Sequence, residues 1–243
     1  MSLDPGIATG RTDIARLAAA ARSILACPAD IHLTIDGFDD VATEAAPAQL
    51  QDVDGQPHFI CPADSAIAQA AAEARGAVLT LRSGLGDDGS AERDAALTLS
   101  GRLRTAGLEN CACCDQPQVR VSLDLDFAAL IRTAQHQQAR VRVPLADFVS
   151  PAHDLNRGFL QRSLEHANLC HQEELRRAIA TRTNTRLAEV LGAQLADLRA
   201  DGVLLQWVDT TGSHQADLVF ARSARNAHQL GELLRTQLHA GLC

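Results

Sequence analysis

The sequence predicts an α+β protein: a small antiparallel β-barrel of six or seven strands in residues 1–150, followed by a helix-helix-hairpin-helix domain in residues 151–243. Two observations predict this architecture. Short segments of alternating apolar and polar residues follow one another through the first part of the chain, which is typical of strands with one buried face. From Phe159 onward the apolar residues recur with helical spacing, and this change indicates a boundary between two units.

The first elements of the barrel are predicted in the first quarter of the chain. Residues 12–25 place their apolar side chains on one helical face. Residues 31–35 alternate between apolar and polar and end at a turn. Segments 48–53 and 57–61 flank Asp54-Gly55, a strong signal for a two-residue β-hairpin. We expect this hairpin to lie against the strand at 31–35.

The rest of the barrel is predicted as one short helix and four more strands. The helix covers residues 62–75, and the strands cover residues 77–81, 95–103, 119–127 and 140–143. The pattern at 119–127 is the clearest of these, because five apolar residues alternate with four polar ones and so give one buried face.

The second unit begins after a connector at residues 151–156. A helix is predicted from Phe159 through Ile179, and a second helix at 184–198, where leucines recur every three or four residues. A β-hairpin follows within residues 203–220, and a terminal helix begins near Ser223.

The composition excludes several classes of protein. The chain of 243 residues is 46% hydrophobic and 21% charged, as is ordinary for a globular protein. It has no apolar run of transmembrane length, and residues 1–12 lack the pattern of a signal peptide, so we expect a cytoplasmic protein with no membrane partner. A net charge of −8 and an aromatic content of 3% argue against nucleic-acid binding.

All 22 cationic side chains are arginines, so the chain has no lysine. This excludes Schiff-base chemistry and the lysine contact that many cofactor phosphates receive. The seven cysteines include Cys111, Cys113 and Cys114 in a polar loop. Their spacing fits a redox pair or half of a metal site, but no second pair matches it, and thiol oxidation is the simpler expectation.

The most specific motif is His166-Ala167-Asn168-Leu169-Cys170-His171. On a helix, His166 and His171 point about 140° apart, which excludes the paired histidines of a zinc protease. His166 and Cys170 share a face, but two ligands do not make a metal site. A purely structural role, in which the two histidines brace the domain, stays open.

With the helix-helix-hairpin-helix pattern, this motif resembles the small domain attached to HugZ-type proteins. These are haem-binding split-barrel proteins of the pyridoxamine-phosphate-oxidase-like superfamily, in which the motif reads H-M-N-x-D-H. His166, Asn168 and His171 match it, and Cys170 stands where the family usually has Asp. The run from Asp126 to Arg132 is similar to the D-F-x-L-x-R run of the last barrel segment, although the glycines that follow in the family are absent.

The resemblance implies a split β-barrel, a homodimer formed through it, and haem b as the cofactor. Haem requires an apolar slot, an axial donor and cations for its propionates. The resemblance makes Arg132 the candidate propionate or distal-pocket residue, although a solvated charge at a strand end is an equal alternative. The axial candidates are His153, His166 and His239, and Asn168 and His171 complete the set of cofactor-binding candidates.

Two other functions stay open. A flavin- or deazaflavin-dependent oxidoreductase on the same barrel would bind FMN or coenzyme F420. The segment from Cys61 to Ile67, where flavin-binding relatives commonly place a basic residue, has none, and Arg82, Arg102 or Arg104 would have to replace it. A regulatory interaction module without cofactor is the third reading. Whether the chain is an enzyme is undecided; haem degradation would require an external reductant. His214 and His228 are predicted to lie on the surface.

Overall fold

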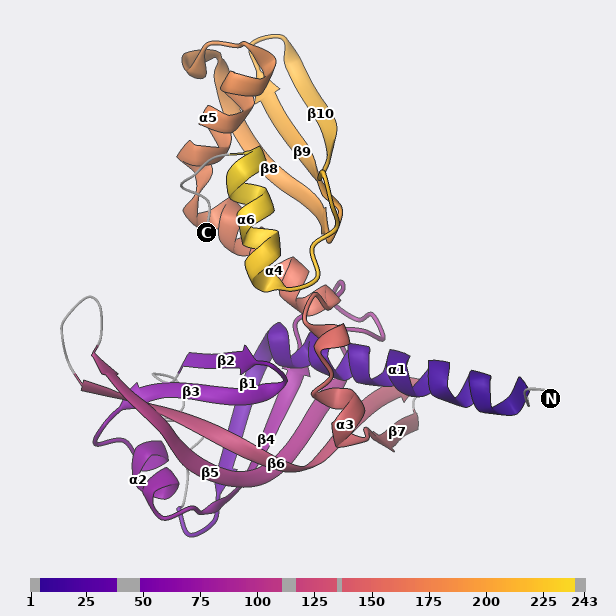
Figure 1. The fold of residues 1–243 in the computed structure, drawn as a ribbon, viewed down its shortest axis with the longest axis vertical. Helices are drawn as coiled ribbons and strands as arrows, with labels where there is room; N and C mark the ends of the chain where they lie inside the picture. The colour runs from indigo at the N-terminus through magenta and orange to yellow at the C-terminus, as the bar shows by residue number, and fades with distance from the viewer. Residues whose placement is uncertain (1–4, 39–48, 111–116, 135–136, 239–243) are drawn as a thin grey trace. The chain divides into compact units, whose positions relative to one another are not determined.

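The computed structural model describes residues 5–38, 49–110, 117–134 and 137–238 (Figure 1). The chain divides into two compact units, residues 1–158 and residues 159–243. Cys111, Cys113, Cys114 and His239 lie outside the described residues.

The first unit is built around one antiparallel sheet of seven strands. Its strand order is β1-β4-β5-β6-β3-β2, and β7 also pairs with β6. The elements are α1 (Pro5–Ala26), β1 (Pro28–Ile35), β2 (Gln49–Val53), β3 (Gln56–Pro62), α2 (Ala66–Ala72), β4 (Gly76–Ser83), β5 (Ala96–Asn110), β6 (Pro117–Ala134), β7 (Gln137–Arg142), α3 (Leu145–Phe148) and the 3₁₀ turn η2 (Pro151–His153). The sheet curls into a half-barrel (Figure 1), which confirms the predicted α+β class and strand number.

The alternating residues of neighbouring strands form the core of this unit. Leu79 and Leu81 of β4 lie opposite Leu99 and Leu97 of β5, and all four are fully buried. Burial of such side chains provides the main driving force for folding. β5 bends at Gly101, where an added Cβ would lie 2.0 Å from the carbonyl oxygen of Asp124 on β6, so only glycine fits there.

Two features of the first unit differ from the prediction. Helix α1 begins at Pro5, before the predicted start at residue 12. The β2–β3 hairpin has the predicted turn, but β1 pairs with β4, and β3 pairs with β6. The physical reason is that β3 buries Phe59 and Cys61 opposite the apolar face of β6, so its apolar partner comes from far along the chain.

The second unit consists of helices and a three-stranded sheet of order β10-β9-β8. Its elements are α4 (Arg157–Cys170), which begins just before the boundary, α5 (Gln172–Thr183), the 3₁₀ turn η3 (Leu187–Glu189), β8 (Val190–Arg199), β9 (Gly202–Asp209), β10 (Gly212–Val219) and α6 (Ala227–Gln237). The predicted order of helices and hairpin is present, with one additional strand before the hairpin.

That additional strand replaces the helix predicted at 184–198, which is wrong. The pairing of β8 with β9 shifts register after Val190 and after Ala196, and these β-bulges space the buried residues unevenly. A strand with two bulges therefore resembles a helical repeat. Asn184 ends α5 in the left-handed conformation (φ 53°) instead of beginning a helix.

Two further boundaries in this unit differ from the sequence reading. The single helix predicted from Phe159 to Ile179 is divided at His171 into α4 and α5. The terminal helix α6 begins at Ala227 and not near Ser223. Its N-cap is Asn226, whose side chain accepts a hydrogen bond from the amide of Gln229.

A buried arginine connects four elements of the first unit. Arg22 of α1 is 2% exposed, and its Nε donates to Asp52 Oδ2 at the β2–β3 turn over 3.0 Å. Its Nη1 donates to the carbonyl oxygen of Phe148 at the end of α3 over 3.1 Å, and Asp154, just after η2, lies 3.7 Å away. Asp52 Oδ1 also accepts from the amide of Gly55 over 2.8 Å, which fixes the turn.

We predict that Arg22→Met destabilises the first unit by about 3–5 kcal/mol, because the buried carboxylate of Asp52 loses its partner. The free energy of unfolding from urea titrations would measure this. Arg16→Met is the matched control, because Arg16 is an exposed arginine of the same helix, and its loss should change the free energy by less than about 0.5 kcal/mol. Equal stability of the two variants would contradict the role given to Arg22.

Candidate functional site

The first unit contains a mainly apolar cavity of about 540 Å³, a volume within the usual range of small-molecule and cofactor sites. One wall is the face of α1 that carries Ala19, Ala20 and Ile24. The opposite walls come from the segment between β4 and β5 and from the end of β6. Small alanine side chains on the helix keep its backbone near the sheet and leave the volume between them open.

Arg132 lies at the end of β6 on the rim of this cavity. It follows Leu130, which is buried and lines the same cavity, and alternate residues of a strand share a face. Arg132 is exposed and forms no hydrogen bond or ion pair with any residue that the structure describes. Its guanidinium is therefore available to a ligand that carries a carboxylate or phosphate.

The second arginine on the rim is already neutralised. Arg157 forms an ion pair with Glu92, and both side chains line the cavity. The cavity thus combines apolar walls, a neutralised ion pair and one available guanidinium. This arrangement fits an amphipathic ligand with an acidic group on one side. Neither Glu92 nor Arg157 belongs to a sequence motif, so neither was predicted.

His153 lies three residues from the cavity wall. Asn156 lines the cavity, and its Nδ2 donates to the carbonyl oxygen of His153 over 2.8 Å. Burial, followed by the nearby Arg22 guanidinium, lowers the pKa of His153, so its imidazole favours the neutral form that binds metals. None of the described histidines lines the cavity itself.

The histidine motif lies in the second unit and forms a compact cluster. The rings of His166 and His171 meet edge to face with centroids 5.2 Å apart. Asn168 holds β8 with both ends of its amide: Nδ2 donates to the carbonyl oxygen of Leu195 over 2.9 Å, and Oδ1 accepts from the amide of Leu195 over 2.7 Å. Asn168 therefore has a structural role, because its side chain connects α4 to β8. The described residues include no group of three or more side chains able to hold a metal ion.

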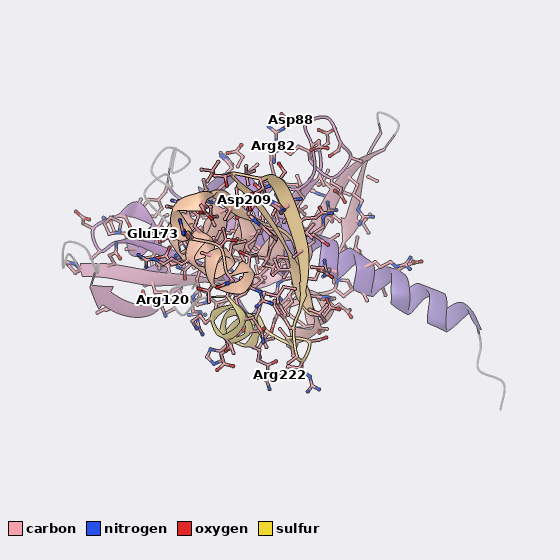
Figure 2. The ribbon with its side chains drawn as sticks, turned by 90° about the horizontal axis from the view of Figure 1, so that it is seen from above. Arg82, Asp88, Arg120, Glu173, Asp209 and Arg222 are labelled. Carbon is pink, nitrogen blue, oxygen red and sulfur yellow. The ribbon has the colours of Figure 1, made fainter. Side chains whose placement is uncertain are left out.

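His214 is half-buried at the surface, and it has partners that the sequence did not indicate. It stacks on Trp207 with ring centroids 5.3 Å apart and lies 2.9 Å, through Nε2, from Asp209 Oδ1. Asp209, labelled in Figure 2, ends β9 and also accepts hydrogen bonds from the amide and the hydroxyl of Thr211. These hydrogen bonds, with that from His214, hold the pKa of Asp209 well below its ordinary value. His228 is exposed, as expected, beside Glu232.

Two of the three arginines that flavin binding would need have partners within the protein. Arg104 pairs with Asp124 over 2.9 Å, and Arg102 Nη1 donates to the carbonyl oxygen of Ala74. Arg82 is exposed (Figure 2). The hydroxyl of Ser65 caps α2 by accepting from the amide of Ala68, so it is occupied by the protein's own backbone.

Comparisons with known proteins do not identify the family. No family model and no curated protein matches the chain. A haem-binding protein from Mycobacterium smegmatis is similar in structure, with 13% identity, 90% of this chain and 95% of that chain covered, and a TM-score of 0.39. A protein of unknown function from Agrobacterium tumefaciens gives 18% identity, 92% and 94% coverage, and a TM-score of 0.37. These likenesses are distant. Within the described residues, no helix is long and apolar enough to span a membrane.

We predict that Asn168→Ala destabilises the second unit by about 2 kcal/mol, because two hydrogen bonds to the backbone of Leu195 are lost. Trp207 is the only tryptophan of the chain, so its fluorescence in urea reports on this unit. Asn168→Asp keeps the acceptor but places a carboxylate oxygen against the carbonyl oxygen of Leu195, so it should also be less stable than the parent. An unchanged midpoint for Asn168→Ala would show that the amide does not brace the unit.

We also predict that the first unit gains stability as the pH rises toward 6.5, the ordinary pKa of an imidazole. Burial lowers the folded-state pKa of His58 and His153, with Arg120 and Arg22 as the second causes. The unfolded chain therefore binds more protons in this window, and the free energy of unfolding increases with pH. Urea midpoints at several pH values would measure the slope. The slope of the urea midpoint against pH should decrease in His58→Gln and in His153→Gln. An unchanged slope in both variants would contradict the attribution of the pH dependence to these histidines.

Proposed function

We propose that this chain is a haem-binding protein and that the cavity beside α1 and β6 holds haem b. The observation that carries the proposal is Arg132, an arginine without a described counterion on the rim of an apolar cavity of about 540 Å³. A haem has a broad apolar ring and two propionates at one edge, so it needs both features. The resemblance of the histidine motif and of the Asp126–Arg132 run to haem-binding split barrels supports the same ligand.

Different residues of the cavity would bind different parts of the haem. Arg132 would hold a propionate through a charge-assisted hydrogen bond, which contributes about 1.5–3 kcal/mol. Leu130 and the alanines of α1 would cover the ring and exclude water. The carboxylate of Glu92 would repel propionates from the rim near Arg157, so the acidic edge would face Arg132.

The axial donor is proposed to be one of His153, His166 and His239. Of these, His153 lies in the first unit, three residues from the cavity wall. Bound haem would supply an iron able to bind O₂ and accept electrons from an external reductant. We propose a role in storage, delivery or oxidative degradation of haem, in a cytoplasmic homodimer.

Titration of the purified protein with hemin should produce a sharpened and shifted Soret band. Arg132→Met should weaken binding about 10- to 100-fold, because the propionate loses its charged partner. Arg140→Met is the matched control, since Arg140 pairs with Ile131 on the other face of the β6–β7 hairpin and does not line the cavity. A spectrum identical to that of free hemin, or equal losses in both variants, would refute the proposal.

A second pair of variants tests the location of the haem. Ala20→Phe would fill the cavity and should abolish the Soret shift, whereas Ala15→Phe, on an exposed position of α1, should preserve it. Single alanine variants of His153, His166 and His239 then identify the axial donor by the change in the band. Bleaching of the band after addition of reductant and air would indicate degradation, and persistence would indicate a binder.

A further inference from the structure

The neutral polar side chains of the cavity beside α1 and β6 are bonded to the protein's own backbone. They are Ser23, Ser83 and Asn156, and all three are buried. Ser23 Oγ donates to a carbonyl oxygen of its own helix over 2.8 Å, and Ser83 Oγ accepts from the amide of Leu85 over 3.1 Å. Asn156 Nδ2 donates to a backbone carbonyl oxygen over 2.8 Å. These side chains therefore hold the walls in place and are not directed to a ligand.

The charged side chains of the lining leave one group open. Glu92 and Arg157 form an ion pair with each other, whereas Arg132 has no partner within the described part of the chain. The other lining side chains are those of alanine, leucine and isoleucine. Burying a polar group without a partner costs free energy, so a ligand of this cavity should have an acidic group near Arg132 and an apolar surface elsewhere.

The side chains that most often ligate haem iron are not among the described lining residues. Haem iron is usually held by His, Cys, Met or Tyr, and none of these lines the cavity where the structure describes it. A histidine beyond the wall, such as His153, would add affinity for the iron complex alone. The apolar walls and Arg132 would contact the porphyrin ring whatever its centre holds.

We propose that this cavity selects the closed porphyrin ring, with or without iron, and rejects linear tetrapyrroles that end in lactams. The inference rests on the haem proposal, because it places the tetrapyrrole in the same cavity. A closed porphyrin carries its propionates at one edge and apolar groups around the rest of its outline. A linear tetrapyrrole keeps the propionates but adds a C=O and an N–H group at each end. The described side chains of the walls offer these groups no partner.

This selectivity depends on what the walls lack, and such discrimination is strong. A site rejects a ligand that would leave buried polar groups unpaired more effectively than it rejects one that differs only in size. A linear tetrapyrrole brings two such ends into the cavity, and the single open guanidinium of Arg132 is needed for the propionate. The cavity would therefore retain a closed ring and release an opened one.

The fluorescence of metal-free protoporphyrin IX gives a direct test with the full chain. Titration should produce a saturable increase in emission, because the ring leaves water. Biliverdin, which also carries two propionates, should bind at least about 10-fold more weakly than protoporphyrin. Arg132→Met should weaken haem and protoporphyrin by the same factor, about 10- to 100-fold. The alanine variants of the candidate axial histidines should leave the affinity for protoporphyrin unchanged.

A variant of the wall tests the reason for the selectivity. Ala91 lines the cavity and is exposed, so Ala91→Asn adds a free amide at a position that tolerates it. The difference in affinity between protoporphyrin and biliverdin should then decrease at least about 3-fold. Ala72→Asn is the matched control, because Ala72 is also exposed and does not line the cavity, and it should preserve the difference.

The outcomes separate this inference from the haem proposal. Biliverdin that binds as tightly as protoporphyrin overturns the inference, and so does haem binding without saturable binding of protoporphyrin; the haem proposal survives both results. Equal effects of Ala91→Asn and Ala72→Asn, or binding of protoporphyrin that persists in Ala20→Phe, also overturn it. Absence of haem binding refutes the proposed function, and absence of binding by all three tetrapyrroles refutes both.

Discussion

The first unit depends on one buried cation. Arg22 has almost no exposure, and burying a guanidinium costs several kcal/mol unless its hydrogen bonds are made within the protein. Asp52 and the carbonyl group of Phe148 accept hydrogen bonds from it, and Asp154 adds an ion-pair contact at 3.7 Å. Burial raises the pKa of Asp52 even beside this arginine, so the desolvation of the carboxylate outweighs its attraction to Arg22. The ion pair therefore contributes less to stability than to geometry, because only one placement of α1 satisfies all of these groups.

That placement determines the shape of the candidate site. Arg22 points from α1 toward the β2–β3 turn and α3, and the neighbouring face of the same helix supplies Ala19, Ala20 and Ile24 to the cavity wall. The rim opposite is set by β6, where Leu130 and Arg132 alternate with residues of the other face. The cavity is thus a consequence of where α1 is held relative to the end of one strand.

The local alternation of apolar and polar residues predicted most of the strands. It could not predict which strands pair when they are far apart in the sequence. The Asp54-Gly55 turn was readable because its residues favour positive φ, as both adopt here. The strand that pairs with this hairpin could not be predicted, because Phe59 of β3 and Val121 of β6 are far apart in the sequence. β8 was misread since its bulges convert period two into a helix-like spacing.

Residues of the candidate site could be predicted from the sequence only where they belong to a motif that resembles one of a known family. Arg132 belongs to such a run and lines the cavity, and its role in binding a ligand stays a prediction. The burial of Arg22 had no local signal, because a cation on a helix normally faces solvent. The partners of His214 were not predicted, since Asp209 lies across the turn; a turn placed at Thr210-Thr211 would have put Trp207 and His214 opposite each other.

The two hydrogen bonds of Asn168 also affect how the second unit meets other chains. β8 is an edge of its sheet, and an edge strand exposes amide and carbonyl groups that can pair with a strand from another molecule. Asn168 occupies both groups of Leu195, and Arg176 Nε donates to the carbonyl oxygen of Val190. Side chains of α4 and α5 therefore take the place of a further strand, and they protect this edge against aggregation by strand addition.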